Sequence, residues 1–367
     1  MKRFINGYTL FGCVLLYHTI WIFQGLDVTD YGQHLTSQVN AFNLQVTDAG
    51  VFSLIFLTNF VGGMWLRILN EPNLLWARFG GVLLFSLNAL LSYKILSVYF
   101  DRKRVFFTVF AATLLITQRI LTVLVDYYNF PALLQTIELL ILNQLLHTPS
   151  ERNAFKVYSF LLGFMAIPII LARIPLILIV LVPGLVFLYY AIAKKDMTDL
   201  KASAPYVILG TMISLTFFVL FYKAISFLGI YIDSVKSLIF ASVTENTDII
   251  DEHYTVTALA KRYIRKYMRA FKLTVLASIC LYIVSLLKDR LGNKITIALG
   301  LVLVAWAFGF HFAALRLIRT LIGLTLLVSF IFFMHDRGKN RNVSLLLIVS
   351  NFIMIINHIG SDYEIKP

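Results

Sequence analysis

Apolar segments long enough to cross a lipid bilayer recur along the whole chain, and this pattern restricts the fold more than any motif does. Hydrophobic residues make up 59% of the sequence and charged residues only 14%, whereas soluble domains usually contain about a quarter charged residues. Lipid offers no hydrogen bonds to open backbone groups, so each spanning segment is expected to be an α-helix. The pattern predicts an all-α, polytopic membrane protein in which residues 1–367 form a single transmembrane domain.

The hydrophobic segments predict about eleven spanning helices. The first is interpreted as a retained span, because it lacks a small-residue cleavage site and further helices follow it. Two long loops, at residues 24–75 and 228–269, are expected on the same side of the membrane. The expected spans are residues 4–23, 76–99, 105–125, 131–147, 156–173, 175–193, 203–227, 270–287, 294–314, 317–334 and 343–359.

Residues 50–69 are apolar enough to form a further span, and the distribution of Lys and Arg argues against it. If this segment lies along the outer leaflet or dips into it, sixteen Lys and Arg fall in cytoplasmic segments and five in the outer segments other than the loop 228–269. The positive-inside rule then places the N-terminus in the cytoplasm and both long loops outside. The basic stretch 261–272 departs from this bias, and it fits either an interfacial helix on anionic lipid or a clamp for a lipid phosphate.

The basic cytoplasmic loops also account for the net charge of +13. Membrane lipids are therefore expected partners and nucleic acid is not. Cys13 and Cys280 both fall inside apolar segments, which fits neither a disulfide framework nor a metal cluster.

The first long loop begins with an acidic stretch that holds Asp27, Asp30 and His34. A carboxylate at this position can act as a general base or bind a divalent ion, although outer loops often contain acids with no such role. His34 follows Asp30 by four residues, so the two share a face if the stretch is helical. Two such groups are only a weak metal signal, so a divalent metal ion is an open possibility as the cofactor.

Three basic residues, Arg78, Arg173 and Lys223, come from well-separated parts of the chain but are expected at the same membrane boundary. Charges within spanning segments are costly and usually face a cavity or a partner. Cations that converge at the level of the acidic loop would form a phosphate-binding site, for which Arg is well suited. The alternative is that these side chains reach lipid headgroups independently.

Two other features have weaker functional interpretations. Glu138 is an acid deep within an expected span, where pairing with Arg119 is favoured over a proton relay. His253 lies in an acidic cluster of the second long loop, for which a solvated surface is the simpler explanation. The sequence contains no phosphate-binding glycine loop, zinc motif or serine-hydrolase motif that would indicate another chemistry.

Four segments together resemble the GT-C glycosyltransferases, which include the protein O-mannosyltransferases and the aminoarabinose transferases of lipid A. GLDVTDYGQHL stands where that family has its acidic motif, and VFSLIFLTNFVGGMWLRIL stands where it has an apolar juxtamembrane stretch. NLLWARFGGVLL, with Arg78, and SFLLGFMAIPIILARIPLIL, with Arg173, match spans that carry a basic residue. The match departs from the family in that the two acids are not adjacent and the outer loop lacks a proline-rich run.

The resemblance implies transfer of a sugar from a lipid-linked sugar donor, a polyprenyl phosphate, to a glycan, lipid or protein acceptor. Asp30 or Asp27 would be catalytic, and the substrate would contact Arg78, Arg173, His34, Lys223 and His253. It also implies a multi-pass protein of the bacterial inner membrane, acting at the extracytoplasmic face on a cell-envelope glycan. The alternatives are an O-antigen polymerase or ligase type of protein, and a transporter or flippase for lipid-linked glycans. No internal repeat of the kind common in transporters is evident.

Overall fold

The computed structural model describes residues 5–23, 28–44, 51–68, 73–117, 124–126, 129–173, 197–241 and residue 348. The chain divides into two compact units, Met1–Ala241 and Ser242–Pro367. Every helix named below belongs to the first unit, which is described by itself. The described residues form helices joined by short loops, with no β-strand among them, as the sequence predicts.

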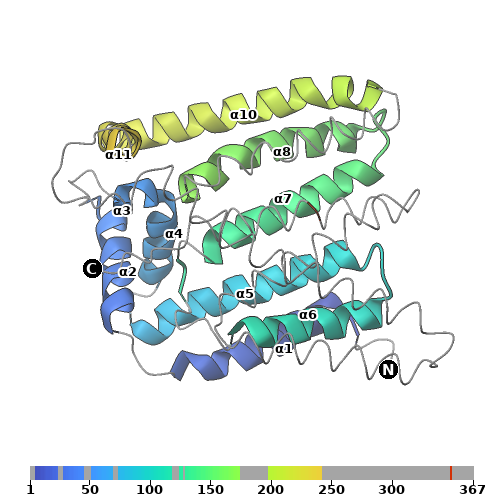
Figure 1. Ribbon diagram of the computed structural model, residues 1–367, viewed down its shortest axis with the longest axis horizontal. Helices are drawn as coiled ribbons and strands as arrows, with labels where there is room; N and C mark the ends of the chain where they lie inside the picture. Colours follow the sequence, from blue (N-terminus) through green and yellow to red (C-terminus); the bar gives the residue numbers. More distant parts are fainter. Residues whose placement is uncertain are drawn as a thin grey trace, which may run out of the picture. The chain divides into compact units, whose positions relative to one another are not determined.

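Six longer helices of this unit lie side by side with their axes in a common direction, and we call them the bundle (Figure 1). Four shorter helices lie at one end of the bundle, and of these we call α2, α3 and α4 the cap. The bundle consists of α1 (Gly7–Ile20, extended by the 3-10 turn Trp21–Phe23), α5 (Leu74–Leu96), α6 (Arg102–Thr117), α7 (Asn129–His147), α8 (Asn153–Ala172) and α10 (Thr198–Ala224). The shorter helices are α2 (Val28–Phe42), α3 (Val51–Leu54), α4 (Phe56–Arg67) and α11 (Leu228–Ala241).

Three of the described helices, α5, α8 and α10, are long and apolar enough to cross a bilayer. The outward side of α10 is apolar along its length, with Ile208, Met212 and Phe217 exposed by 45% or more. Such a surface suits lipid rather than water. The protein is therefore a membrane protein in character, and the count of eleven spans stays a prediction.

Close backbone contact holds α8 to α10. A Cβ atom added at Gly163 would come within 2.0 Å of the Val207 carbonyl oxygen, and one added at Gly210 would come within 2.1 Å of the Phe160 carbonyl oxygen. Thr211 adds a hydrogen bond of 3.1 Å from its hydroxyl to the Gly163 carbonyl oxygen. Small residues at helix contacts are the usual basis of packing in membranes, where apolar burial gives little drive.

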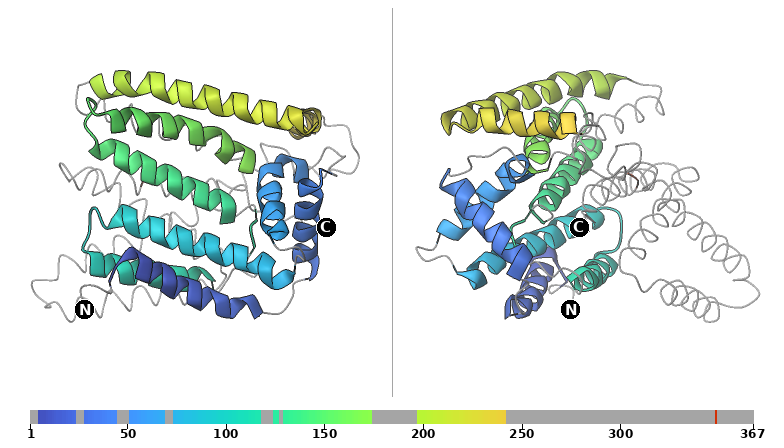
Figure 2. Two further views of the ribbon diagram at one scale, coloured as in Figure 1. Left: turned by 180° about the vertical axis from the view of Figure 1, so that it is seen from behind. Right: turned by 60° about the vertical axis from the view of Figure 1, so that its left-hand side comes forward.

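The cap crosses one end of the bundle, and the three views agree on this position (Figures 1 and 2). Within the cap, α2 and α4 pack closely because Gly62 and Gly63 leave room for Gln38. An apolar cluster joins Leu66 of α4 to Ala77 of α5 and to Leu124. A second cluster joins the cap to the ends of α8, α10 and α11. The cap is thereby fixed to several helix ends at once.

The helices occupy the expected positions for the spans 4–23, 76–99, 105–125, 131–147, 156–173 and 203–227, with ends shifted by a few residues. Residues 50–69 contain α3 and α4, which pack in the cap. The expected span 175–193, the basic stretch 261–272 and all expected spans from 270 onward lie outside the described residues. The outlines of the loops 24–75 and 228–269 are therefore seen only in part.

Candidate functional site

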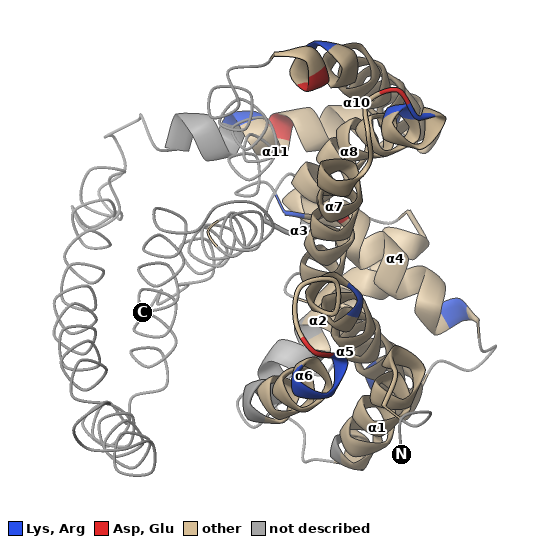
Figure 3. Cartoon of the chain, turned by 90° about the vertical axis from the view of Figure 1, so that its right-hand side faces the viewer, with Lys and Arg blue, Asp and Glu red and all other residues tan. Residues whose placement is uncertain are grey.

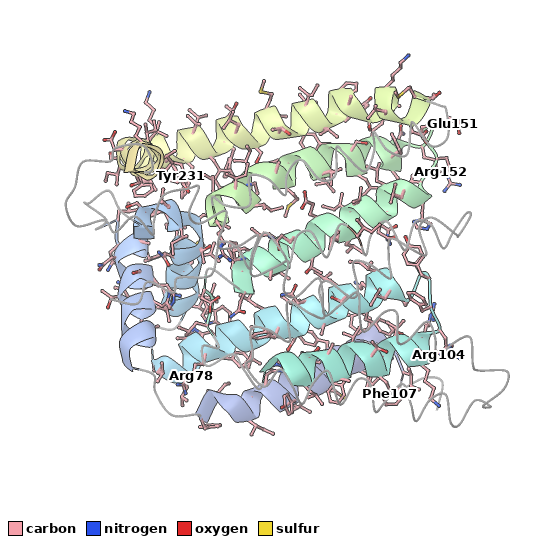
Figure 4. All side chains as sticks on the ribbon, viewed as in Figure 1. Arg78, Arg104, Phe107, Glu151, Arg152 and Tyr231 are labelled. Carbon is pink, nitrogen blue, oxygen red and sulfur yellow. The ribbon has the colours of Figure 1, made fainter. Side chains whose placement is uncertain are left out.

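Arg78 lies within the first two turns of α5, directly at the cap (Figure 4). The helix begins where it does because the Asn73 side chain accepts a hydrogen bond of 2.8 Å from the Trp76 amide, which is a standard N-cap. The Arg78 side chain is only 2% exposed. Its Nη1 atom donates to the Ile22 carbonyl oxygen, at the end of α1. Arg78 thus joins the start of one bundle helix to the end of another.

Arg173 occupies the corresponding position at the end of α8. Its backbone is extended, and its amide bonds the carbonyl oxygens of Ile169 and Ile170, so the helix ends there. The side chain is 4% exposed. The preceding residue, Ala172, accepts a hydrogen bond of 3.1 Å at its carbonyl oxygen from the Thr58 hydroxyl of α4. Arg173 is therefore held against the cap, as Arg78 is.

The inner face of α2 is polar. His34 and Gln38, one turn apart, are both buried, and the Gln38 amide donates a bond of 2.7 Å to the Val125 carbonyl oxygen. Asp30 lies one turn before His34 in the same helix, and its side chain lies outside the described part of the structure. The stretch that holds Asp30 and His34 is helical, which meets the condition under which the two residues share one face.

Asp126 is a buried acid that the sequence interpretation missed. Its side chain is 1% exposed. It accepts hydrogen bonds from the Asn129 amide, at 2.8 Å, and from the Asn129 side chain, at 3.2 Å, and so caps the start of α7. An acid in a short loop normally points to water. The signal that was available is its place just before the expected span 131–147, where an acid can cap the start of a helix.

A pair of tryptophans fastens the cap to α5. The rings of Trp65 and Trp76 stack at 4.3 Å with planes 11° apart. Each indole N–H donates to the backbone carbonyl oxygen of the other residue, at 2.8 and 2.9 Å. Gly80 lies against the Trp65 ring and has no space for a Cβ atom. The tryptophan pair thus fixes α4 relative to the helix that carries Arg78.

Aromatic side chains hold the other side of the cap to α10 and α11. Phe56 stacks on Phe227 with ring centroids 3.9 Å apart, and Tyr222 lies edge-on to both Phe56 and Tyr231. Tyr231 belongs to α11 (Figure 4). Burial raises the pKa of its phenol to about 12 because the charged form would lose hydration. This aromatic cluster packs the cap against α10 and α11, and the Tyr231 phenol is its titratable group.

Of the remaining predicted residues, the structure describes the side chains of Lys223 and Glu138 only. Lys223, in the last turn of α10, is exposed. Asp27 and His253 lie outside the described residues, as does Arg119, the expected partner of Glu138. Glu138 itself is 2% exposed within α7.

No set of three or more His, Cys, Asp or Glu side chains suited to a metal ion occurs among the residues that the structure describes. The metal ligands considered from the sequence include Asp27, which is outside them.

The arrangement brings two guanidinium groups and one carboxylate into the buried layer under the cap, counting the described side chains alone. Comparison with known proteins adds no family to this geometry: no protein-family model, no curated protein and no solved structure matches the chain.

Proposed function

We propose that this protein is a membrane glycosyltransferase of the GT-C kind. It transfers a sugar from a polyprenyl-phosphate donor to a hydroxyl group of a glycan, lipid or protein acceptor at the outer face of the bacterial inner membrane. The observation that carries the proposal is the burial of Arg78 and Arg173 under one cap, from helices far apart in the sequence.

Burying a guanidinium group is costly, and such groups are retained where they bind a carboxylate, a phosphate or a carbonyl group. Among the described side chains under the cap, two arginines accompany one carboxylate, that of Asp126. Two guanidinium groups at the level of an acidic helix suit a substrate that carries an anionic group. Arginine also offers paired donors that match phosphate oxygens.

The chemistry requires a base and an anion-stabilising group. In the proposed step, Asp30 or Asp27 accepts the proton of the acceptor hydroxyl as its oxygen bonds to the anomeric carbon of the sugar. The bond between that carbon and the phosphate oxygen breaks, and the electron pair leaves with the polyprenyl phosphate. Arg78 and Arg173 stabilise the charge that grows on this phosphate, which is where prearranged donors lower a barrier most.

A transporter for lipid-linked glycans is the second candidate, and one observation favours it. Glu138 is almost fully buried in the middle of α7, and an acid at such a depth often belongs to an ion or proton pathway. A transferase has no evident need of this residue. The two functions therefore predict different effects for Glu138→Gln.

The test is a transfer assay in membranes with radiolabelled polyprenyl-phosphate sugars. Asp30→Asn or Asp27→Asn should abolish turnover, and Arg78→Lys and Arg173→Lys should each lower it about 10–1,000-fold, since charge stays but the paired donors are lost. Lys236→Gln is the matched control, because Lys236 is exposed and already pairs with Asp233 at 3.3 Å.

Full turnover in both aspartate variants would overturn the proposal. Loss of glycan export in Glu138→Gln, without any sugar transfer by the wild type, would establish the transporter instead.

A further inference from the structure

The free end of α4 carries a surface whose composition differs from the rest of the cap. Met64, Arg67 and Ile68 lie three and four positions apart, so they share one side of the helix end. Met64 is 50% exposed and Ile68 is 63% exposed, and Arg67 is exposed between them. Leu44, at the end of α2, and Leu75, at the start of α5, add two further exposed apolar side chains.

The guanidinium group of Arg67 is held in place at this surface. Its Nη2 atom donates a hydrogen bond of 2.8 Å to the Asn43 Oδ1 atom, and the group lies 5.7 Å from the centre of the Phe42 ring. No ion pair of Arg67 occurs among the described residues. The remaining donors of Arg67 are thus oriented without a carboxylate from the described part of the chain.

The backbone next to Arg67 is also unusual. Leu44 has a φ of 56°, a left-handed conformation that bulky residues adopt at a cost of about 1 kcal/mol or more. The consequence is an exposed leucine at the end of α2, beside Asn43. This conformation ends α2 and leaves an apolar side chain exposed next to the Asn43 that holds Arg67.

The position of α4 indicates what this surface contacts. Seen along the bundle, α4 extends to the side of the column formed by α1, α5, α7, α8 and α10 (Figure 3). Arg67 belongs to the last turn of α4. α5 and α8 are long and apolar enough to cross a membrane, and α5 starts and α8 ends at the cap. When these helices span the bilayer, the cap is at the level of the lipid headgroups. A helix end that overhangs the spans at this level lies over lipid.

We propose that the overhanging end of α4, with Arg67 at its centre, binds an anionic phospholipid of the surrounding leaflet. The phosphate contacts the free donors of Arg67, and the upper part of the acyl chains packs on Met64, Ile68, Leu44 and Leu75. A cation framed by apolar side chains at an interface is the arrangement that selects an anionic lipid over a zwitterionic one. This inference does not depend on the proposed glycosyl transfer.

The test uses the full chain in lipid nanodiscs, with a bimane label on Met64→Cys in a Cys13→Ala, Cys280→Ala background. The nanodiscs contain phosphatidylcholine and phosphatidylglycerol, and the quencher is a doxyl group near the top of one acyl chain of either lipid. At equal mole fraction, quenching by labelled phosphatidylglycerol should exceed that by labelled phosphatidylcholine about two- to fivefold, which is the range expected for one basic side chain. The excess should decrease as salt is raised.

Arg67→Gln should bring the two lipids to equal quenching, while Arg67→Lys should keep part of the excess. Lys236→Gln is the matched control, since it removes another exposed cation that already pairs with Asp233, and it should leave the excess unchanged. Equal quenching by both lipids in the wild type would overturn the proposal. The proposal would also be overturned if neither labelled lipid quenched the bimane. Quenching by aqueous iodide would then show that the label is in water, and its absence would show that protein covers the label.

Discussion

Arg78 and Arg173 lie near the ends of spanning helices, where a long cationic side chain reaches the headgroups at little cost. Both are instead almost fully buried. Arg78 connects two elements through its own bond to Ile22, and the residue before Arg173, Ala172, accepts a bond from Thr58 of the cap. The cap lies over the helix ends that carry Arg78 and Arg173, so these side chains do not reach water. This argues that the positive charge beneath the cap is retained for an interaction.

The burial of Tyr231 predicts how the stability of the protein depends on pH. The pKa of its phenol rises from 10.0 to about 12 on folding because of burial. Below pH 10 the phenol is protonated in both states, so the contribution of its burial to stability is complete. Between these two pH values the unfolded chain releases the proton and the folded chain does not. The free energy of unfolding therefore falls as pH rises, by at most about 1.4 kcal/mol per pH unit for this group.

Tyr231→Phe should make the alkaline loss of stability shallower, measured as denaturation midpoints in detergent over the same pH range. Tyr8→Phe is the control, because Tyr8 is 75% exposed and its removal should leave the alkaline loss unchanged. If Tyr231→Phe and the wild type lose stability in parallel, the phenol is not buried as described.

At the scale of elements, the contact between α8 and α10 depends on the absence of two Cβ atoms. Gly163→Ala or Gly210→Ala would bring a methyl group against a backbone carbonyl oxygen at about 2 Å, and a backbone cannot move aside as a flexible side chain does. Each variant should lose about 1–3 kcal/mol of stability, measured as the fraction that stays monodisperse after heating. Gly12→Ala, which has no neighbour within 4 Å, should be neutral or slightly more stable.

A Gly163→Ala protein that withstands heating as well as Gly12→Ala would show that the two helices do not approach this closely. The double variant Gly163→Ala, Gly210→Ala provides a second test of the contact between α8 and α10. Its loss should be less than the sum of the single losses, because one separation of the helices relieves both contacts.

The presence of the long apolar helices α1, α5, α6, α7, α8 and α10 was predictable from sequence to within a few residues at their ends, since hydrophobic length in a membrane is a local property of the chain. The helices α2 and α11 were not predicted, because they lie in segments expected to be loops. The pairing of helices was not, because Gly163 and Gly210 acquire a role only when brought together by the fold. Asp126 was missed for the same reason: an acid next to a helix start indicates a cap, but its burial depends on Gln38 and α2 covering the neighbouring Val125. Arg78, Arg173 and Lys223 were expected at one membrane boundary, but their different burial could not be predicted: Arg78 and Arg173 are buried and Lys223 is exposed. A shared phosphate site for these residues stays a prediction.

At the scale of the whole molecule, exposed basic residues gather at the end of the bundle opposite the cap. Arg104 and Arg152 mark that end, and Arg78 marks the other (Figure 4). Of the described exposed Lys and Arg, those at the end away from the cap are Lys94, Arg102, Lys103, Arg104, Arg152, Lys156 and Lys201, and those at the cap end are Arg67, Lys223 and Lys236. The positive-inside rule then predicts that the cap faces outward.

Cysteine labelling in intact cells tests this orientation, in a Cys13→Ala, Cys280→Ala background. Thr36→Cys, exposed on α2 of the cap, should react with a membrane-impermeant maleimide added outside. Glu151→Cys, exposed in the loop between α7 and α8 at the opposite end, should react only after permeabilisation. The two sites serve as controls for each other, because each confirms that the reagent reaches its own side. The reverse pattern would place Asp30 and the buried arginines at the cytoplasmic face, and sugar transfer at the outer face would then have no site.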